Sequence, residues 1–103
     1  MTAGQLDPAF AATARLQIAA VLAQVDSGEF SRLREITGVS DSVLSKHLSA
    51  LVEAGYVTLS KSALAGRQRT WASLTKPGRA AFTGHVAALQ AMVAAAGAAG
   101  AAG

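Results

Sequence analysis

The chain has 103 residues, a formal net charge of +3 and no cysteine; 51% of its residues are hydrophobic, although only 5% are aromatic. This length favours one domain with an aliphatic core, and the absence of cysteine excludes disulfides, thiolate nucleophiles and cysteine metal sites. The first residues lack the pattern of a signal peptide and no long run is strongly apolar, so we expect a cytoplasmic protein with no membrane partner.

Positive charge is concentrated in the second half of the chain. Residues 1–45 carry three arginines and five carboxylates, whereas residues 46–103 carry six basic side chains and one carboxylate. Such an asymmetry indicates a polyanionic partner, of which nucleic acid is the first candidate.

Three helices are predicted in the first half of the chain. The first begins at Asp7-Pro8, where aspartate can cap free N–H groups and proline is tolerated, and it reaches about Val25 with a break near residues 12–14. A short extended segment follows, and then a brief helix runs from Ser31 through Thr37. Gly38 allows a tight turn before a third helix over residues 41–54.

The second half is predicted to form a hairpin and a last helix. Residues 57–60 alternate in polarity as a strand, residues 63–68 form the tip, and residues 69–74 return. The last helix covers about residues 75–94, and residues 95–103, three Ala-Ala-Gly repeats, are expected to be a disordered tail because glycine disfavours helix. The predicted fold is mainly α with a small β-hairpin, in the order α-β-α-α-β-β-α of a winged helix-turn-helix domain over residues 6–94.

The helix over residues 41–54 has two contrasting faces. Leu44, Leu48 and Leu51 have the spacing of a buried stripe, and the other face carries Ser42, Ser45, Lys46 and Ser49. Short hydroxyls allow the helix backbone to approach a duplex closely, and they donate to phosphates or to base acceptors.

Several motifs resemble MarR- and ArsR-type bacterial transcriptional regulators. They are Ser-Lys-His-Leu at residues 45–48, Glu-Ala-Gly-Tyr-Val at residues 53–57 and Leu-Thr-x-x-Gly-Arg at residues 74–79. The chain is most similar to the compact stand-alone winged-helix members of this group. The resemblance implies that helix 41–54 enters a major groove and that the hairpin tip, the wing, contacts the flanking backbone or minor groove.

Two sets of functional residues are predicted, one for DNA binding and one for dimerisation. Lys46 is the strongest candidate for direct DNA contact, either with a phosphate or with a guanine, and Arg67 would lie in or along a minor groove. The full DNA-binding set is Ser31, Arg32, Ser42, Ser45, Lys46, Ser49, Lys61, Arg67 and Arg69. The last helix carries two apolar rows, more than one small domain needs to cover, so a homodimer is expected through Phe82, His85, Val86, Leu89, Met92 and Val93.

Other chemistry finds no support in the sequence. His47 is expected to be a half-buried packing residue, and Trp71 a packing or dimer residue. No nucleophile–base set or metal-ligand spacing is present, so no enzyme activity, cofactor or metal is predicted. A small-molecule effector is left open.

The sequence therefore predicts a homodimeric, sequence-specific regulator of transcription that binds double-stranded DNA, a repressor rather than an activator. The alternative is a winged-helix module that binds a protein without reading DNA.

Overall fold

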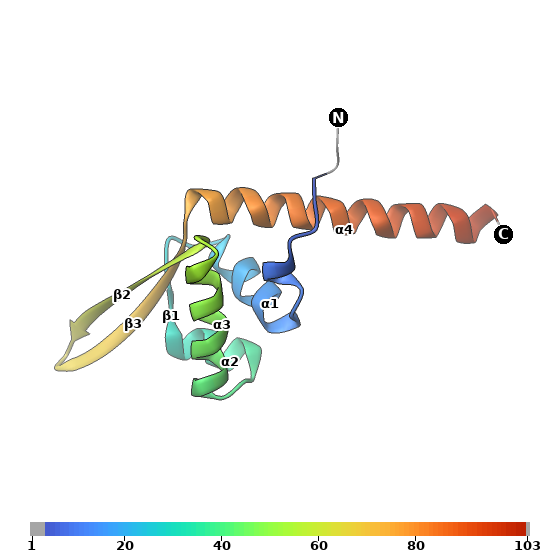
Figure 1. The fold of residues 1–103 in the computed structure, drawn as a ribbon. Helices are drawn as coiled ribbons and strands as arrows, with labels where there is room; N and C mark the ends of the chain where they lie inside the picture. Colours follow the sequence, from blue (N-terminus) through green and yellow to red (C-terminus); the bar gives the residue numbers. More distant parts are fainter. Residues whose placement is uncertain (1–3, 103) are drawn as a thin grey trace.

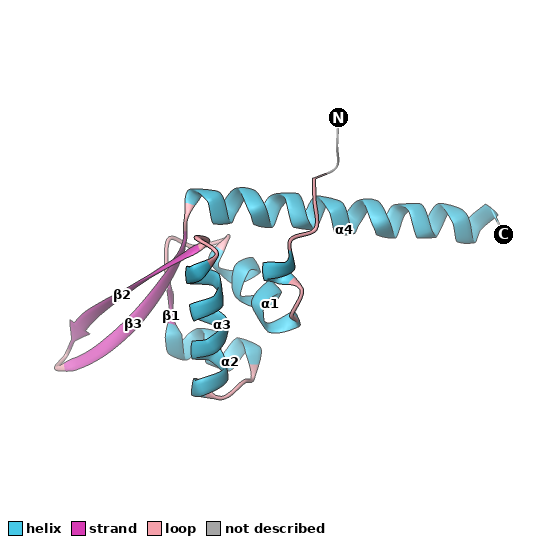
Figure 2. Cartoon of the chain, viewed as in Figure 1, coloured by secondary structure: helices cyan, strands magenta, loops and turns pink. Residues whose placement is uncertain are grey.

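The computed structural model describes residues 4–102, and its elements follow the predicted order (Figures 1 and 2). They are the 3₁₀ turn η1 (Pro8–Phe10), α1 (Thr13–Leu22), β1 (Gly28–Glu29), α2 (Phe30–Thr37), α3 (Asp41–Glu53), β2 (Val57–Leu64), β3 (Arg67–Leu74) and α4 (Lys76–Ala102). The strands form one antiparallel sheet in the order β1-β3-β2. The β2–β3 hairpin extends from the body of the molecule, and the fold is the predicted winged helix.

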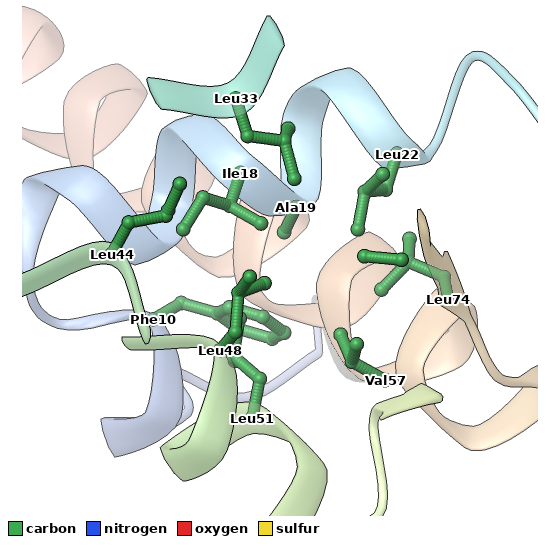
Figure 3. Packing of buried hydrophobic residues seen from close by; sticks show 11 residues of the cluster. Phe10, Ile18, Ala19, Leu22, Leu33, Leu44, Leu48, Leu51, Val57 and Leu74 are labelled. Carbon is green, nitrogen blue, oxygen red and sulfur yellow. The ribbon is translucent and has the colours of Figure 1, made fainter. Parts of the chain in front are cut away.

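The core lies among α1, α2, α3 and the base of the sheet (Figure 3). Each helix contributes the apolar side chains of one face, and β2 and β3 close the core from the side. The buried hydrophobic residues are Phe10, Ile18, Ala19, Leu22, Leu33, Leu44, Leu48, Leu51, Val57, Ala72 and Leu74. Since α3 contributes three of these leucines, its orientation is fixed by packing.

The N-terminal segment packs on the body of the molecule through the ring of Phe10. Asp7 accepts a hydrogen bond from the Ala9 N–H and caps η1, which turns Phe10 into the core with 1% of its surface exposed. The Phe10 ring stacks on Tyr56 at 5.6 Å between centroids and meets Phe82 edge-on at 5.9 Å. The break predicted near residues 12–14 is the junction between η1 and α1.

The Leu-Thr-x-x-Gly-Arg motif joins the sheet to α4 and closes the end of α1. The Thr75 hydroxyl donates to the Gly55 carbonyl and accepts from the Gly78 N–H. Gly78 is buried against the Tyr56 carbonyl, where a side chain would not fit. The Arg79 guanidinium donates to carbonyls at the C-terminal end of α1, including that of Ala23 at 3.1 Å. These carbonyls have no partner within the helix, so Arg79 acts as their cap.

Helix α4 is longer than the sequence predicts. It continues through Ala102, so the expected disorder from residue 95 is wrong for the described part of the tail; residue 103 lies outside the described residues. The reason is the excess of alanine, which has the highest helix propensity and offsets the cost of the interspersed glycines. The second half of α4 projects beyond the body of the molecule (Figure 1).

Two glycines of α4 provide a matched test of the contact between the start of α4 and the Tyr56 backbone. We expect Gly78→Ala to lower the free energy of unfolding by about 1–3 kcal/mol or more, because the added Cβ meets the Tyr56 backbone. Gly97→Ala meets no atom within 4 Å and should leave stability unchanged or raise it by up to about 1 kcal/mol. Urea denaturation of both variants measures the difference. Equal unfolding free energies would contradict the close contact between α4 and Tyr56.

Candidate nucleic-acid interface

The outward face of α3 is hydroxyl-rich and exposed, as predicted. Ser42, Ser45, Lys46 and Ser49 are all exposed, while the leucines of the opposite face are at most 2% exposed. Ser40 caps the helix, because its hydroxyl accepts a hydrogen bond from the Val43 N–H at 3.3 Å. In Figure 1 the N-terminal end of α3 lies on the side of the molecule away from α4.

An exposed ion pair links the first residue of α3 to the helix before it. Arg34 on α2 donates to the Asp41 carboxylate at 2.9 Å, which raises the pKa of the guanidinium through this hydrogen bond and the charge of Asp41. Both side chains are substantially exposed, so the pair contributes little to stability. Its consequence is local: it holds the Arg34 side chain beside the first turn of α3.

His47 links α3 to α1. The Arg15 Nε–H donates to His47 Nδ1 at 3.0 Å, so the neutral ring carries its proton on Nε2. The pKa of His47 is lowered, first because the ring is partly removed from water and then because Arg15 is positively charged. The side chain is half-buried, which agrees with its predicted role in packing.

The wing is a long hairpin with a two-residue turn. Ala65 and Gly66 have φ of 53° and 76°, the left-handed values that a type I′ hairpin turn requires. Residues on alternate positions point to opposite faces, and Lys61 pairs with Thr70 whereas Arg69 pairs with Ser62. Lys61 therefore lies on the other face of the hairpin from Arg67 and Arg69.

A polar hollow of about 460 Å³ lies where the wing meets α2. Its lining is rich in arginine and consists of Glu29, Ser31, Arg34, Arg67, Gln68 and Arg69. We call this the arginine hollow. It is the place where the helix-turn-helix and the wing adjoin, and its Arg34 also touches the first residue of α3.

One carboxylate occupies part of the arginine hollow. Glu29 accepts from the Ser31 hydroxyl at 2.9 Å and from the Arg69 guanidinium at 3.0 and 3.1 Å. The pKa of Glu29 is lowered, chiefly by the Ser31 hydrogen bond and further by Arg69, so the side chain is charged at neutral pH. Ser31 and Arg69, two predicted DNA-binding residues, are thus already held by a group of the same charge as a phosphate.

Besides Lys61, the structure places Arg32 apart from the arginine hollow, and it adds Arg34 to the hollow. Arg32 lies near Glu35 at 3.5 Å and lines a different hollow, whose apolar side chains include Val21 of α1 and Trp71. Arg34, which is not among the residues predicted from the sequence, lines the arginine hollow instead. The sequence spacing does indicate Arg34: Ser31 and Arg34 are three residues apart, so they share a helix face, whereas Ser31 and Arg32 do not.

The predicted dimer residues of α4 divide into two groups. Phe82 is half-buried against Phe10, and His85 is only 5% exposed. His85, predicted as an interface residue, has contacts inside the protomer: its Nδ1 accepts from the Asp7 backbone N–H at 2.9 Å, and its ring packs on Phe10. It also lines an apolar hollow beside α4, so its place in a dimer interface stays a prediction.

The remaining dimer candidates form an accessible apolar row. Val86 and Leu89 are half-buried, and Met92 and Val93 are 56% and 72% exposed. A mainly apolar hollow of about 500 Å³ adjoins this row and is lined by Leu6, Asp7, Pro8, Phe10, Ala11, Leu16, His85 and Leu89. The apolar surface thus continues from α4 onto the N-terminal segment.

Helix α4 also has the length and hydropathy of a membrane span, which the sequence analysis did not expect. Over residues 76–98 it contains an 18-residue window of mean hydropathy 1.3, of which 6% is buried. Its first turns are nevertheless packed on the body through Phe82 and His85. Residues 90–98, further along the helix, are exposed.

Proteins of similar sequence or structure support the assignment of a winged-helix fold. The uncharacterized protein MJ0432 of Methanocaldococcus jannaschii is 35% identical over 77 residues, which cover 75% of this chain and 84% of that protein. The structure of a transcriptional regulator homologue from Pyrococcus horikoshii OT3 matches with a TM-score of 0.72 at 25% identity, over 79% of this chain and 80% of that chain.

A MarR-family structure has the same fold. The zinc-responsive MarR family member ZitR of Lactococcus lactis matches with a TM-score of 0.61 at 21% identity, over 88% of this chain and 62% of that chain. The resemblance to MarR-type regulators that the sequence predicts is thereby confirmed in the fold. Residues 14–93 match the family described as winged helix DNA-binding domain. The chain therefore belongs to the family of winged helix DNA-binding domains.

Proposed function

We propose that this protein is a homodimeric regulator of transcription that binds a specific sequence of double-stranded DNA. The observation that carries the proposal is the exposed serine and lysine face of α3, continuous through Arg34 with the arginine hollow at the base of the wing. A duplex presents base edges in its major groove and a row of phosphates beside it, so it needs both kinds of surface at once. In this proposal α3 enters the major groove and the wing tip at residues 65–66 follows the flanking backbone or minor groove.

The side chains of α3 suit the major groove by size and charge. Ser42 and Ser45 lie in the N-terminal half of the helix, where base contacts usually concentrate. Lys46 adds a positive charge on a long flexible stem, which reaches either a phosphate or a guanine. Ser49 lies further along the helix and contacts the DNA backbone.

The wing contributes mainly charge. Arg67 and Lys61 are exposed, and neither has an ion pair among the described residues. Arg69 and Ser31 are held by Glu29, so they contribute to binding when a phosphate replaces that carboxylate. Arg32 lines a separate hollow, so in this proposal it contacts only a phosphate beyond the main interface.

The apolar row of α4 supports a homodimer. Met92 and Val93 lie on the projecting part of the helix, and a second copy packed there would cover them together with the neighbouring hollow. Two α3 helices would then enter major grooves about one helical turn, ~34 Å, apart on a pseudo-palindromic site. Occupancy of a promoter by such a dimer excludes polymerase sterically, so repression in the cytoplasm is the expected outcome. The apolar hollow beside α4 is the place where a small-molecule effector would fit.

One prediction concerns charge on the DNA-facing surface. Lys46→Ala and Arg67→Ala should each weaken binding to the duplex, by about 1–3 kcal/mol where a contact with a base is lost. Where a contact with a phosphate is lost, the slope of the logarithm of the binding constant against the logarithm of the salt concentration should become smaller in magnitude by about one. Fluorescence anisotropy titrations at several salt concentrations measure both effects. Lys76→Ala is the control, because Lys76 is an exposed lysine separated from the wing tip by the length of β3, roughly 25 Å. Affinities and slopes equal to those of Lys76→Ala would contradict the assignment.

Another prediction concerns the apolar row of α4. The double variant Met92→Glu, Val93→Glu should be monomeric, because two carboxylates would have to be buried in the interface. Sedimentation velocity on the wild type and the variant measures the change. Gln90→Glu, an exposed change on the same helix, should remain dimeric. A wild-type chain that sediments as a monomer at micromolar concentration would refute the dimer.

A further inference from the structure

Val43 is an apolar side chain on the polar end of α3. It is 39% exposed and lies in the first turn of the helix, between Ser42 and the buried Leu44. Lys46 is three residues further on, so the two side chains are neighbours on the helix surface. Val43 does not belong to the buried core or to the partly buried residues packed against it. Its position is at the edge of the face that the proposed function places in the major groove.

The local structure holds Val43 in a defined position. Its backbone N–H donates to the Ser40 hydroxyl, which caps the helix, and the Arg34–Asp41 ion pair links the first residue of α3 to α2. A β-branched side chain in a helix has essentially one rotamer. The exposed part of the Val43 side chain is therefore a rigid apolar surface, whereas the Lys46 side chain beside it is flexible.

The major groove offers one apolar feature that such a surface can recognise. Among the four base pairs, only those with thymine carry a methyl group at the groove edge, and contact with apolar side chains is how it is read. The serines and Lys46 supply hydrogen bonds, which do not detect this methyl group. We propose that Val43 contacts a thymine methyl and so selects thymine at one position of each half-site; this inference rests on the proposed function.

Val52 provides a matched control on the same helix. It is 40% exposed, nearly the same as Val43, but it lies nine residues later, about 13.5 Å along the helix axis. There α3 is close to its end at Glu53 and near the start of the sheet. Truncating Val52 thus removes the same atoms from an equally exposed site away from the proposed base contact.

The test removes the methyl group from the DNA and from the protein separately. A preferred duplex is first selected in vitro from a random pool with the wild-type chain, and each thymine of one half-site is then replaced singly by deoxyuridine. For the wild type, one replacement should weaken binding about fourfold, the loss expected for one buried methyl group. For Val43→Ala the same replacement should have no effect, whereas Val52→Ala should respond like the wild type.

The outcomes separate the two levels of the proposal. If selection with the wild type enriches no sequence, the proposed function itself fails. If a sequence is enriched but every deoxyuridine replacement acts equally on the wild type and Val43→Ala, the role of Val43 is refuted and the function stands. Circular dichroism and urea denaturation check that both alanine variants fold, as expected for exposed positions.

Discussion

The burial of the leucine stripe of α3 is the constraint on which the rest of the structure depends. Leu44, Leu48 and Leu51 are at most 2% exposed, and each contributes roughly 1.5–3 kcal/mol by leaving water. A helix is rigid in cross-section, so fixing one face fixes the other. Ser42, Lys46 and Ser49 point outward because the leucines point inward. The surface proposed to read DNA is therefore a geometric consequence of the core.

The ion pairs around this helix act on a smaller scale. Exposed pairs such as Arg34–Asp41 contribute only about 0–1 kcal/mol, so they adjust side chains without setting the orientation of the helix. They also alter the charge that the surface presents. Two of the three arginines of the arginine hollow are paired with carboxylates, and Arg67 has no ion pair among the described residues. Glu29 holds Ser31 and Arg69, so in the proposed function a phosphate that binds these two side chains has to displace this carboxylate, and part of the gain from that contact is offset.

Much of the fold could be predicted because its boundaries are marked locally. Asp7-Pro8, Gly38 and Gly55 end or begin elements through caps and left-handed turns, and period-two alternation identifies the hairpin. The role of His85 could not be predicted this way. Its partner Asp7 is 78 residues distant, and an apolar row on a helix has the same pattern whether it faces its own core or another subunit. Arg34 was predictable in principle, since the spacing of helix faces selects it over Arg32, whereas the helical tail depended on a balance between alanine and glycine.

The absence of cysteine makes a direct test of the interface available. Single cysteines are introduced at the exposed positions Ser45, Gln68 and Gln90, and an iron chelate attached to each cleaves nearby DNA through hydroxyl radicals. On a duplex that the protein binds, the account predicts cleavage within the major groove of each half-site from position 45, cleavage of the flanking backbone from position 68, and none from position 90 on α4. Strong cleavage from position 90 with none from position 45 would show that DNA binds another face and would contradict the account.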